Sequence, residues 1–129
     1  MTLEEEIAQL PTLKDMGIAL VNFSKTLIDG TTFELRGTRW VAHPENFVTF
    51  EIHWKRAQNI TLSLRGWPAE FLNHEEFPPL QLSPGMAGYS GCKIEVPSQL
   101  AAAAYYIAKA ASLYQAGSTR TRTQPRVIG

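Results

Sequence analysis

Residues 48–55 alternate between apolar and polar side chains, with the apolar Phe47 preceding them on the polar side, and this pattern constrains the fold more than any other feature of the chain. The apolar set comprises Val48, Phe50, Ile52 and Trp54. A second alternating run occupies residues 59–65, after a short polar link. Because successive side chains of a strand point to opposite faces, the two runs predict an antiparallel pair with one buried and one solvated face.

The rest of the chain divides according to its pattern. Apolar residues at steps of three and four predict helices, alternation predicts strands, and frequent proline and glycine predict a loop. We expect helices at 15–28 and 98–116, strands at 33–42, 47–54, 59–65 and 88–96, and a crossing loop at 66–87. This order predicts an α+β fold: a curved antiparallel sheet of about four strands, with an N-terminal and a C-terminal helix packed on one face. The predicted core comprises Phe50, Ile52, Ile60, Leu62, Ile94 and Ile107.

The length of 129 residues fits one compact domain, which we place at residues 1–117. Residues 1–10 are acidic and predict a short helix or a frayed arm. Residues 118–129 are rich in threonine and arginine, and we expect them to form a disordered basic tail.

Three features predict the cellular location. The single cysteine, Cys92, has no partner for an internal disulfide. The first residues are acidic where a signal peptide would be basic and then apolar. The sequence also lacks an apolar run long enough to cross a membrane. We therefore expect a cytoplasmic protein with no membrane partner.

The charge of the chain is balanced, with twelve Lys and Arg residues against twelve Asp and Glu residues. This balance excludes the strongly cationic body that is typical of nucleic-acid-binding proteins. Only the tail is clearly basic, because it holds Arg120, Arg122 and Arg126 and no acidic residue.

Glu51, His53 and Lys55 share one face of the alternating run. A carboxylate that holds an ion and a lysine beside the attacked phosphate are features of a metal-dependent phosphodiesterase, so these three are the candidate catalytic residues. The simpler interpretation, which we prefer, is a solvated strand face with alternating charge. No pair of histidine and cysteine residues has metal-ligand spacing, so we expect no metal and no cofactor.

The same outer face should also carry Phe47 and Arg65. Aromatic and basic side chains on an open sheet can hold single-stranded nucleic acid by stacking and phosphate contact, with Arg120 and Arg122 of the tail in support. The interpretation that we prefer is that the loop at 66–87 covers this face and shields Phe47 without any ligand.

The helix expected at 98–116 contains one charged residue, Lys109. Its core stripe should comprise Leu100, Ala104, Ile107, Ala111 and Tyr114. Tyr105, Tyr106 and Leu113 then lie off this stripe and enlarge the apolar surface. A helix that is apolar all round is usually buried on more than one side, so we interpret these three residues as a contact with another subunit or a partner. The alternative is a surface helix in which alanine serves only as the best helix former.

The stretch from Trp40 to Tyr114 resembles a small domain family loosely labelled "predicted transport protein", whose members occur alone or appended to nuclease-like and restriction-associated proteins. The motifs that carry the resemblance are Asn46-Phe47-Val48, Leu64-Arg65, Gly88-Tyr89-Ser90-Gly91 and the Ile-x-x-Ala-x-x-x-Tyr pattern at 107–114. The family has no established catalytic residues, so the resemblance implies none here.

Together these patterns predict a binding or assembly module rather than an enzyme. We expect it to act through protein–protein contact, including self-association of the closing helix into a homo-oligomer. Nucleic-acid binding by the outer sheet face and the arginine tail is the alternative, and a metal-dependent phosphodiesterase is a further one.

Overall fold

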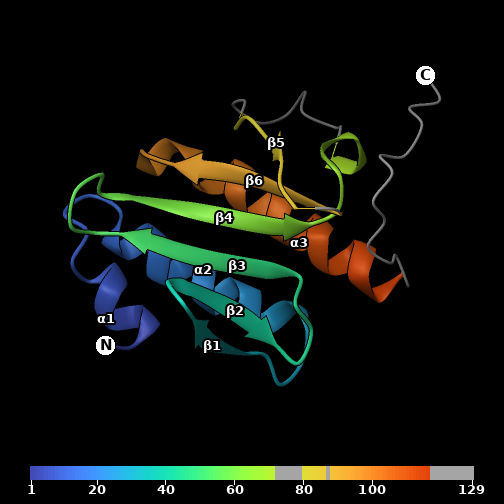
Figure 1. Ribbon diagram of the computed structural model, residues 1–129, viewed down its shortest axis with the longest axis horizontal. Helices are drawn as coiled ribbons and strands as arrows, with labels where there is room; N and C mark the ends of the chain where they lie inside the picture. The colour runs from blue at the N-terminus through green and yellow to red at the C-terminus, as the bar shows by residue number, and fades with distance from the viewer. Residues whose placement is uncertain (72–79, 87, 117–129) are drawn as a thin grey trace.

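Six antiparallel strands form one sheet in residues 1–71, 80–86 and 88–116, the part of the chain that the computed structural model describes (Figure 1). In chain order they are β1 (Thr32–Arg36), β2 (Arg39–His43), β3 (Val48–His53), β4 (Asn59–Arg65), β5 (Ser83–Pro84) and β6 (Tyr89–Ile94). Their order across the sheet is β1-β2-β3-β4-β6-β5, so almost every strand lies beside its neighbour in the chain.

The alternating run that dominates the sequence forms the centre of this sheet. Phe50 lies opposite Leu62 and Ile52 lies opposite Ile60, so the apolar residues of β3 and β4 share one face. This confirms the predicted antiparallel pair and its register. The strand β3 ends at His53, however, and the last two residues of the run, Trp54 and Lys55, lie in the following turn.

The predicted number of about four strands is wrong, and the sheet is only weakly curved. The run at 33–42 is two strands, because the chain reverses at Gly37 with a φ of +66°, a backbone conformation that glycine adopts at little cost. The sixth strand is the two-residue β5, which lies inside the segment predicted to be a loop and pairs with β6.

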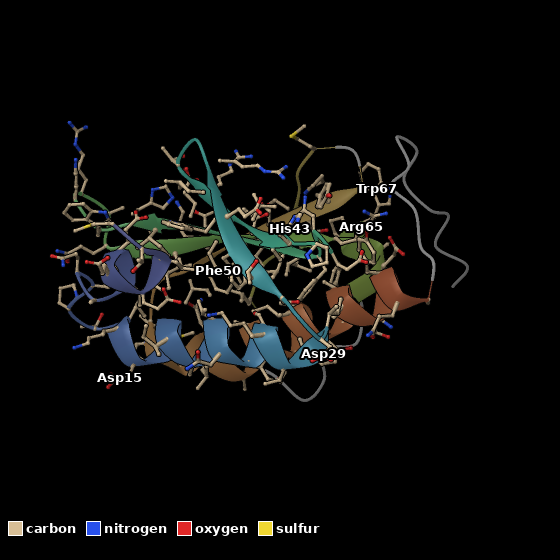
Figure 2. The ribbon with its side chains drawn as sticks, turned by 90° about the horizontal axis from the view of Figure 1, so that it is seen from below. Asp15, Asp29, His43, Phe50, Arg65 and Trp67 are labelled. Atoms are coloured by element: carbon tan, nitrogen blue, oxygen red, sulfur yellow. The ribbon has the colours of Figure 1, made fainter. Side chains whose placement is uncertain are left out.

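Helices lie at both ends of the described chain, as predicted. They are α1 (Leu3–Ile7), α2 (Lys14–Leu27) and α3 (Leu100–Gln115), with the short 3-10 helices η1 (Pro68–Phe71) and η2 (Pro97–Gln99). In Figure 2, α2 and α3 run side by side beneath the sheet, which confirms that both long helices pack on one face. None of the described helices has the length and apolar character needed to span a membrane.

The acidic start of the chain is a docked helix. Thr2 and Glu5 form a reciprocal capping box at the beginning of α1, while Leu3 and Ile7 are buried. A Cβ atom at Gly17 would lie 2.7 Å from Cγ2 of Ile7, so the glycine lets α1 approach α2 closely.

The six residues predicted to form the core are all buried between the sheet and the helices, each with at most 6% of its surface exposed. They belong to one cluster that also includes residues of α1 and α2. The hydrophobic alternation was therefore a sound guide to the interior of the central strands.

The predicted face of the closing helix is right for Ile107 and Ala111, which are buried, and wrong for Leu100 and Tyr106. The residues of α3 that are buried are Ala102, Ala103, Tyr106, Ile107, Ala110 and Ala111. Leu100, expected in the core, is 39% exposed, whereas Tyr106, expected outside, is 4% exposed and donates a hydrogen bond to the carbonyl of Leu80. The buried stripe is rotated by about one residue from the predicted one.

Phe47 is also misplaced by the sequence pattern, because it is fully buried and belongs to the core. It precedes β3 at a bend, where its N–H donates to the carbonyl of Glu45, so the alternation of the strand does not extend to it. Residues 72–79, 87 and 117–129 lie outside the described residues. They include part of the predicted covering loop and the predicted tail with Arg120 and Arg122.

Candidate functional site

One face of the sheet carries no helix in the described chain (Figure 1), and we call it the open face. The strand pairing gives its side chains: Thr32, Glu34, Arg36, Arg39, Val41, His43, Thr49, Glu51, His53, Asn59, Thr61, Ser63, Arg65, Tyr89 and Lys93. Nearly all of them are polar, whereas the opposite face of the same strands is apolar. The alternation of the strands therefore produces a polar surface on which Arg36, Arg39 and Lys93 are exposed, whereas Val41, Thr49 and Asn59 are buried.

Cationic side chains outnumber carboxylates on the open face. Four cations (Arg36, Arg39, Arg65, Lys93) face two carboxylates (Glu34, Glu51), which gives +2 with neutral histidines, although the whole chain has a net charge of zero. Glu34 contacts both Arg36, at 3.7 Å, and His43, at 3.8 Å. The remaining cations spread over β2, β4 and β6.

Aromatic and amide groups surround Arg65 at one end of the open face, and Figure 2 shows this residue near Trp67 at the end away from α1. The guanidinium carbon of Arg65 lies 4.8 Å from the ring centroid of Tyr114. The Tyr114 hydroxyl bonds to the carboxylate of Glu45, and this bond raises the pKa of Tyr114. The amide of Asn46 donates to the Tyr89 hydroxyl at 3.3 Å. The predicted binding residue Arg65 is thus held within a polar and aromatic cluster.

A pocket of about 570 Å³ lies at the opposite end of the sheet, and we call it the end pocket. The β1–β2 turn, the β3–β4 turn and α1 meet there. Its lining residues are Met1, Glu6, Leu35, Gly37, Thr38, Glu51, Ile52, His53, Trp54, Lys55, Arg56 and Ala57. The volume falls within the range of small-molecule sites.

The three candidate catalytic residues all line the end pocket. Nε2 of His53 lies 3.6 Å from Oε1 of Glu51 and 3.0 Å from the hydroxyl of Thr61. The Thr38 hydroxyl donates a hydrogen bond to Oε2 of Glu51. Nζ of Lys55 lies 5.2 Å from the centroid of the Trp54 ring. The structure therefore brings Glu51 and His53 together and places Lys55 on the same pocket from a turn.

The pocket does not supply the ligands of a metal centre. No group of three or more His, Cys, Asp or Glu residues in the described ranges could hold a metal ion. A divalent ion at Glu51 and His53 would have two protein ligands, fewer than catalytic metal sites usually have. A phosphodiesterase at this place would therefore need metal ligands besides Glu51 and His53.

The three residues of the closing helix that we expected to contact another subunit or a partner pack mainly against residues of the same chain. Tyr106 is buried and bonds to Leu80, and Tyr105 and Leu113 are half-buried against the core. A Cβ atom on Gly66 would lie 2.8 Å from Cδ1 of Leu113, so this leucine packs closely on the end of β4.

Sequence reasoning missed the second wall of the end pocket, formed by Glu6, Leu35 and Thr38. Leu35 lies on the inner side of the edge strand β1, yet its side chain is 51% exposed. The sequence signal for this residue is a leucine in an alternating run. No local signal brings Glu6 to this place, since it lies far away in sequence and is oriented by a hydrogen bond from the indole of Trp40.

Comparison with known proteins found no match: no family model, no curated protein and no solved structure matches the chain.

Proposed function

We propose that the protein is a non-enzymatic binding module that holds single-stranded nucleic acid on the open face of its sheet. The observation that carries the proposal is a sheet face that no helix of the described residues covers and on which cationic and hydroxyl side chains replace apolar ones. Such a face binds by phosphate contact and hydrogen bonding, as an open sheet does in many proteins that bind single strands.

The distribution of the cations supports a polyanionic ligand. Arg36, Arg39 and Lys93 stand in one cross-strand row that also holds Glu51 and Thr61. Three strand spacings separate Arg39 from Lys93, or about 14 Å, so these two side chains can contact different phosphates of one strand. Arg65 extends the cationic surface towards the aromatic ring of Tyr114.

The composition of the open face argues against an apolar protein contact in the same place. Val41 is its one aliphatic residue, and it is 9% exposed. The core of a protein–protein interface is usually about two-thirds apolar, and large aromatic or aliphatic anchors supply most of the binding energy. A charged, hydroxyl-rich surface suits the sugar–phosphate backbone better.

The proposal is tested by fluorescence anisotropy with a labelled oligo(dT) of about twelve nucleotides, at salt concentrations between about 50 and 200 mM. The wild type should bind, and the logarithm of its association constant should fall linearly with the logarithm of the salt concentration. The double variant Arg39→Gln/Lys93→Gln should reduce this slope by about 1.4, because each lost phosphate contact to a single strand removes about 0.7.

The matched control is Lys14→Gln/Lys25→Gln, which removes the same charge from α2 on the other side of the molecule. It should keep the wild-type slope. Absence of oligonucleotide binding at the lowest salt concentration, or an equal change of slope in both double variants, would overturn the proposal.

A further inference from the structure

The end pocket combines apolar walls with polar groups of both charges. Leu35, Ile52 and Trp54 provide the apolar surface, and Leu35 is a large residue that the chain itself leaves half exposed. Lys55 and Arg56 are exposed cations at the rim, contributed by the turn that follows β3. A ligand that fits this lining has a flat or apolar body and a negatively charged attachment.

Two partly buried carboxylates, those of Glu6 and Glu51, also face the pocket. Their hydrogen-bond donors are neutral, namely the indole of Trp40 for Glu6 and the hydroxyl of Thr38 for Glu51. Within the described residues, no ion pair joins either carboxylate to a lysine or an arginine. Each carboxylate oxygen has more than one lone pair, so both groups can still accept hydrogen bonds from a ligand.

We propose that the end pocket binds one base of the nucleic-acid strand, and that the base it prefers is guanine. This inference rests on the proposed function of the open face. A carboxylate only accepts hydrogen bonds, and guanine presents two adjacent donors, N1–H and the 2-amino group, on one edge. Uracil and thymine present a single N–H between two carbonyl oxygens. These oxygens are acceptors, so the carboxylate repels them.

The other walls of the pocket match the rest of a nucleotide. The apolar surfaces of Leu35 and Trp54 can cover the flat face of a base, as aromatic and aliphatic side chains do for unstacked bases. Lys55 and Arg56 lie on the same rim and can contact the phosphate. The ring, the donor edge and the phosphate thus each meet a suitable group.

The pocket is continuous with the open face. Glu51 and His53 belong to both, and Glu51 stands between Arg39 and Thr61 in the row that leads to Lys93. A strand that crosses the sheet along this row therefore reaches the pocket at the β3 end, where one base can leave the stack and enter it.

The experiment compares the affinities of three oligonucleotides of equal length: oligo(dT), alternating (dT-dG), and alternating (dT-dI). Deoxyinosine differs from deoxyguanosine only in lacking the 2-amino group. The wild type should bind the guanine oligonucleotide about tenfold more tightly than the inosine one, since one well-placed hydrogen-bonding contact to a base is worth about that factor. The variant Glu51→Gln should reduce this ratio to near one, because its amide nitrogen replaces an acceptor.

The control variant is Glu34→Gln, which removes the same charge from the open face but does not line the pocket. It should keep the wild-type preference for guanine, and a thermal denaturation curve of each variant verifies that it folds. Binding of oligo(dT) together with equal affinities for the guanine and inosine oligonucleotides, or an equal effect of both variants on their ratio, would overturn the base pocket alone. Failure of all three oligonucleotides to bind would instead overturn the proposed function.

Discussion

Cys92 is the single cysteine of the chain, and it lies on the inner side of β6 with 7% of its surface exposed. Its burial raises the pKa of the thiol from an ordinary value of 9.0 to about 12. The thiolate is the nucleophilic form of cysteine, so Cys92 is chemically inert in the folded protein at neutral pH. Its role is that of a small apolar residue beneath the sheet.

The shifted pKa of Cys92 predicts a loss of stability in alkali. Below pH 9.0 the thiol is protonated in both the folded and the unfolded chain, and it contributes no pH dependence. Between pH 9.0 and about 12 the unfolded chain loses this proton while the folded chain retains it, so stability falls as pH rises. The limiting slope is about 1.4 kcal/mol per pH unit.

Urea denaturation of the wild type and of Cys92→Ala at neutral pH and at about pH 10.5 measures this effect. The wild type should lose more free energy of unfolding over this interval than the variant, in which the titrating group is absent. Equal losses in the two proteins would show that the thiol titrates normally in the fold.

The helix α3 shows where the periodicity of an element ceases to be informative. Tyr105, Tyr106 and Ile107 follow one another, and Leu113 and Tyr114 do the same, so apolar side chains cover more than half of the helix circumference. Alanine fits both a core and a surface, so the alanines between them do not decide which side is buried. The sequence predicted the helix, but its buried face is set by packing against α2, β3 and β4.

This placement of Tyr106 predicts a fold defect when the residue is charged. Tyr106→Glu would bury a carboxylate against the core and remove the hydrogen bond to Leu80. An uncompensated buried charge should lower the free energy of unfolding by about 3–5 kcal/mol. Ser112→Glu, at an exposed position of the same helix, should change stability by no more than about 0.5 kcal/mol.

Thermal denaturation and light scattering of both variants distinguish this outcome from self-association. If α3 were a subunit contact, Tyr106→Glu would separate the subunits and leave the melting temperature of the monomer almost unchanged. A homo-oligomer through α3 remains a hypothesis that depends on the half-buried Tyr105 and Leu113.

The strands were more predictable than the hairpin that joins them. The register of β3 and β4 followed directly from alternation, because a shift by one residue would turn every apolar side chain to the solvated face. The split of residues 33–42 into β1 and β2 depended on one reversal at Gly37, which the pattern marked as an interruption without specifying its geometry. The pattern was thus a better guide to which residues are buried than to how many strands they form.

At the scale of the whole molecule, the end pocket assembles residues from three distant segments. Alternation predicted that Glu51 and His53 share a face, because they lie on one strand. Glu6 and Leu35 reach the same pocket only after α1 has docked and the β1–β2 hairpin has closed, so no spacing in the sequence relates them. A site of this kind is visible in the fold and not in the pattern.

The same assembly predicts that the described chain unfolds in one cooperative step. One core cluster contains residues of both long helices, of α1 and of the central strands, so no set of elements has an interior of its own. Far-UV circular dichroism reports on all the helices, and tryptophan fluorescence reports on Trp40, Trp54 and Trp67, of which Trp40 is buried on β2 and bonded to Glu6 of α1. The two signals should therefore change at the same urea concentration.

The variant Leu3→Ala makes this prediction stringent, because Leu3 is 2% exposed and comes from the shortest of the three α-helices. If α1 belongs to the cooperative unit, removing this side chain should lower the midpoints of both signals together, by a free energy of about 2–5 kcal/mol. Gln9→Ala, at an exposed position beyond the end of α1, should leave both midpoints in place. A fluorescence transition that shifts in Leu3→Ala while the circular dichroism transition stays fixed would mean that α1 and the first hairpin separate from the rest before it unfolds. The end pocket, which lies between these two parts, and the β1–β2 portion of the open face would then be lost before the rest of the sheet.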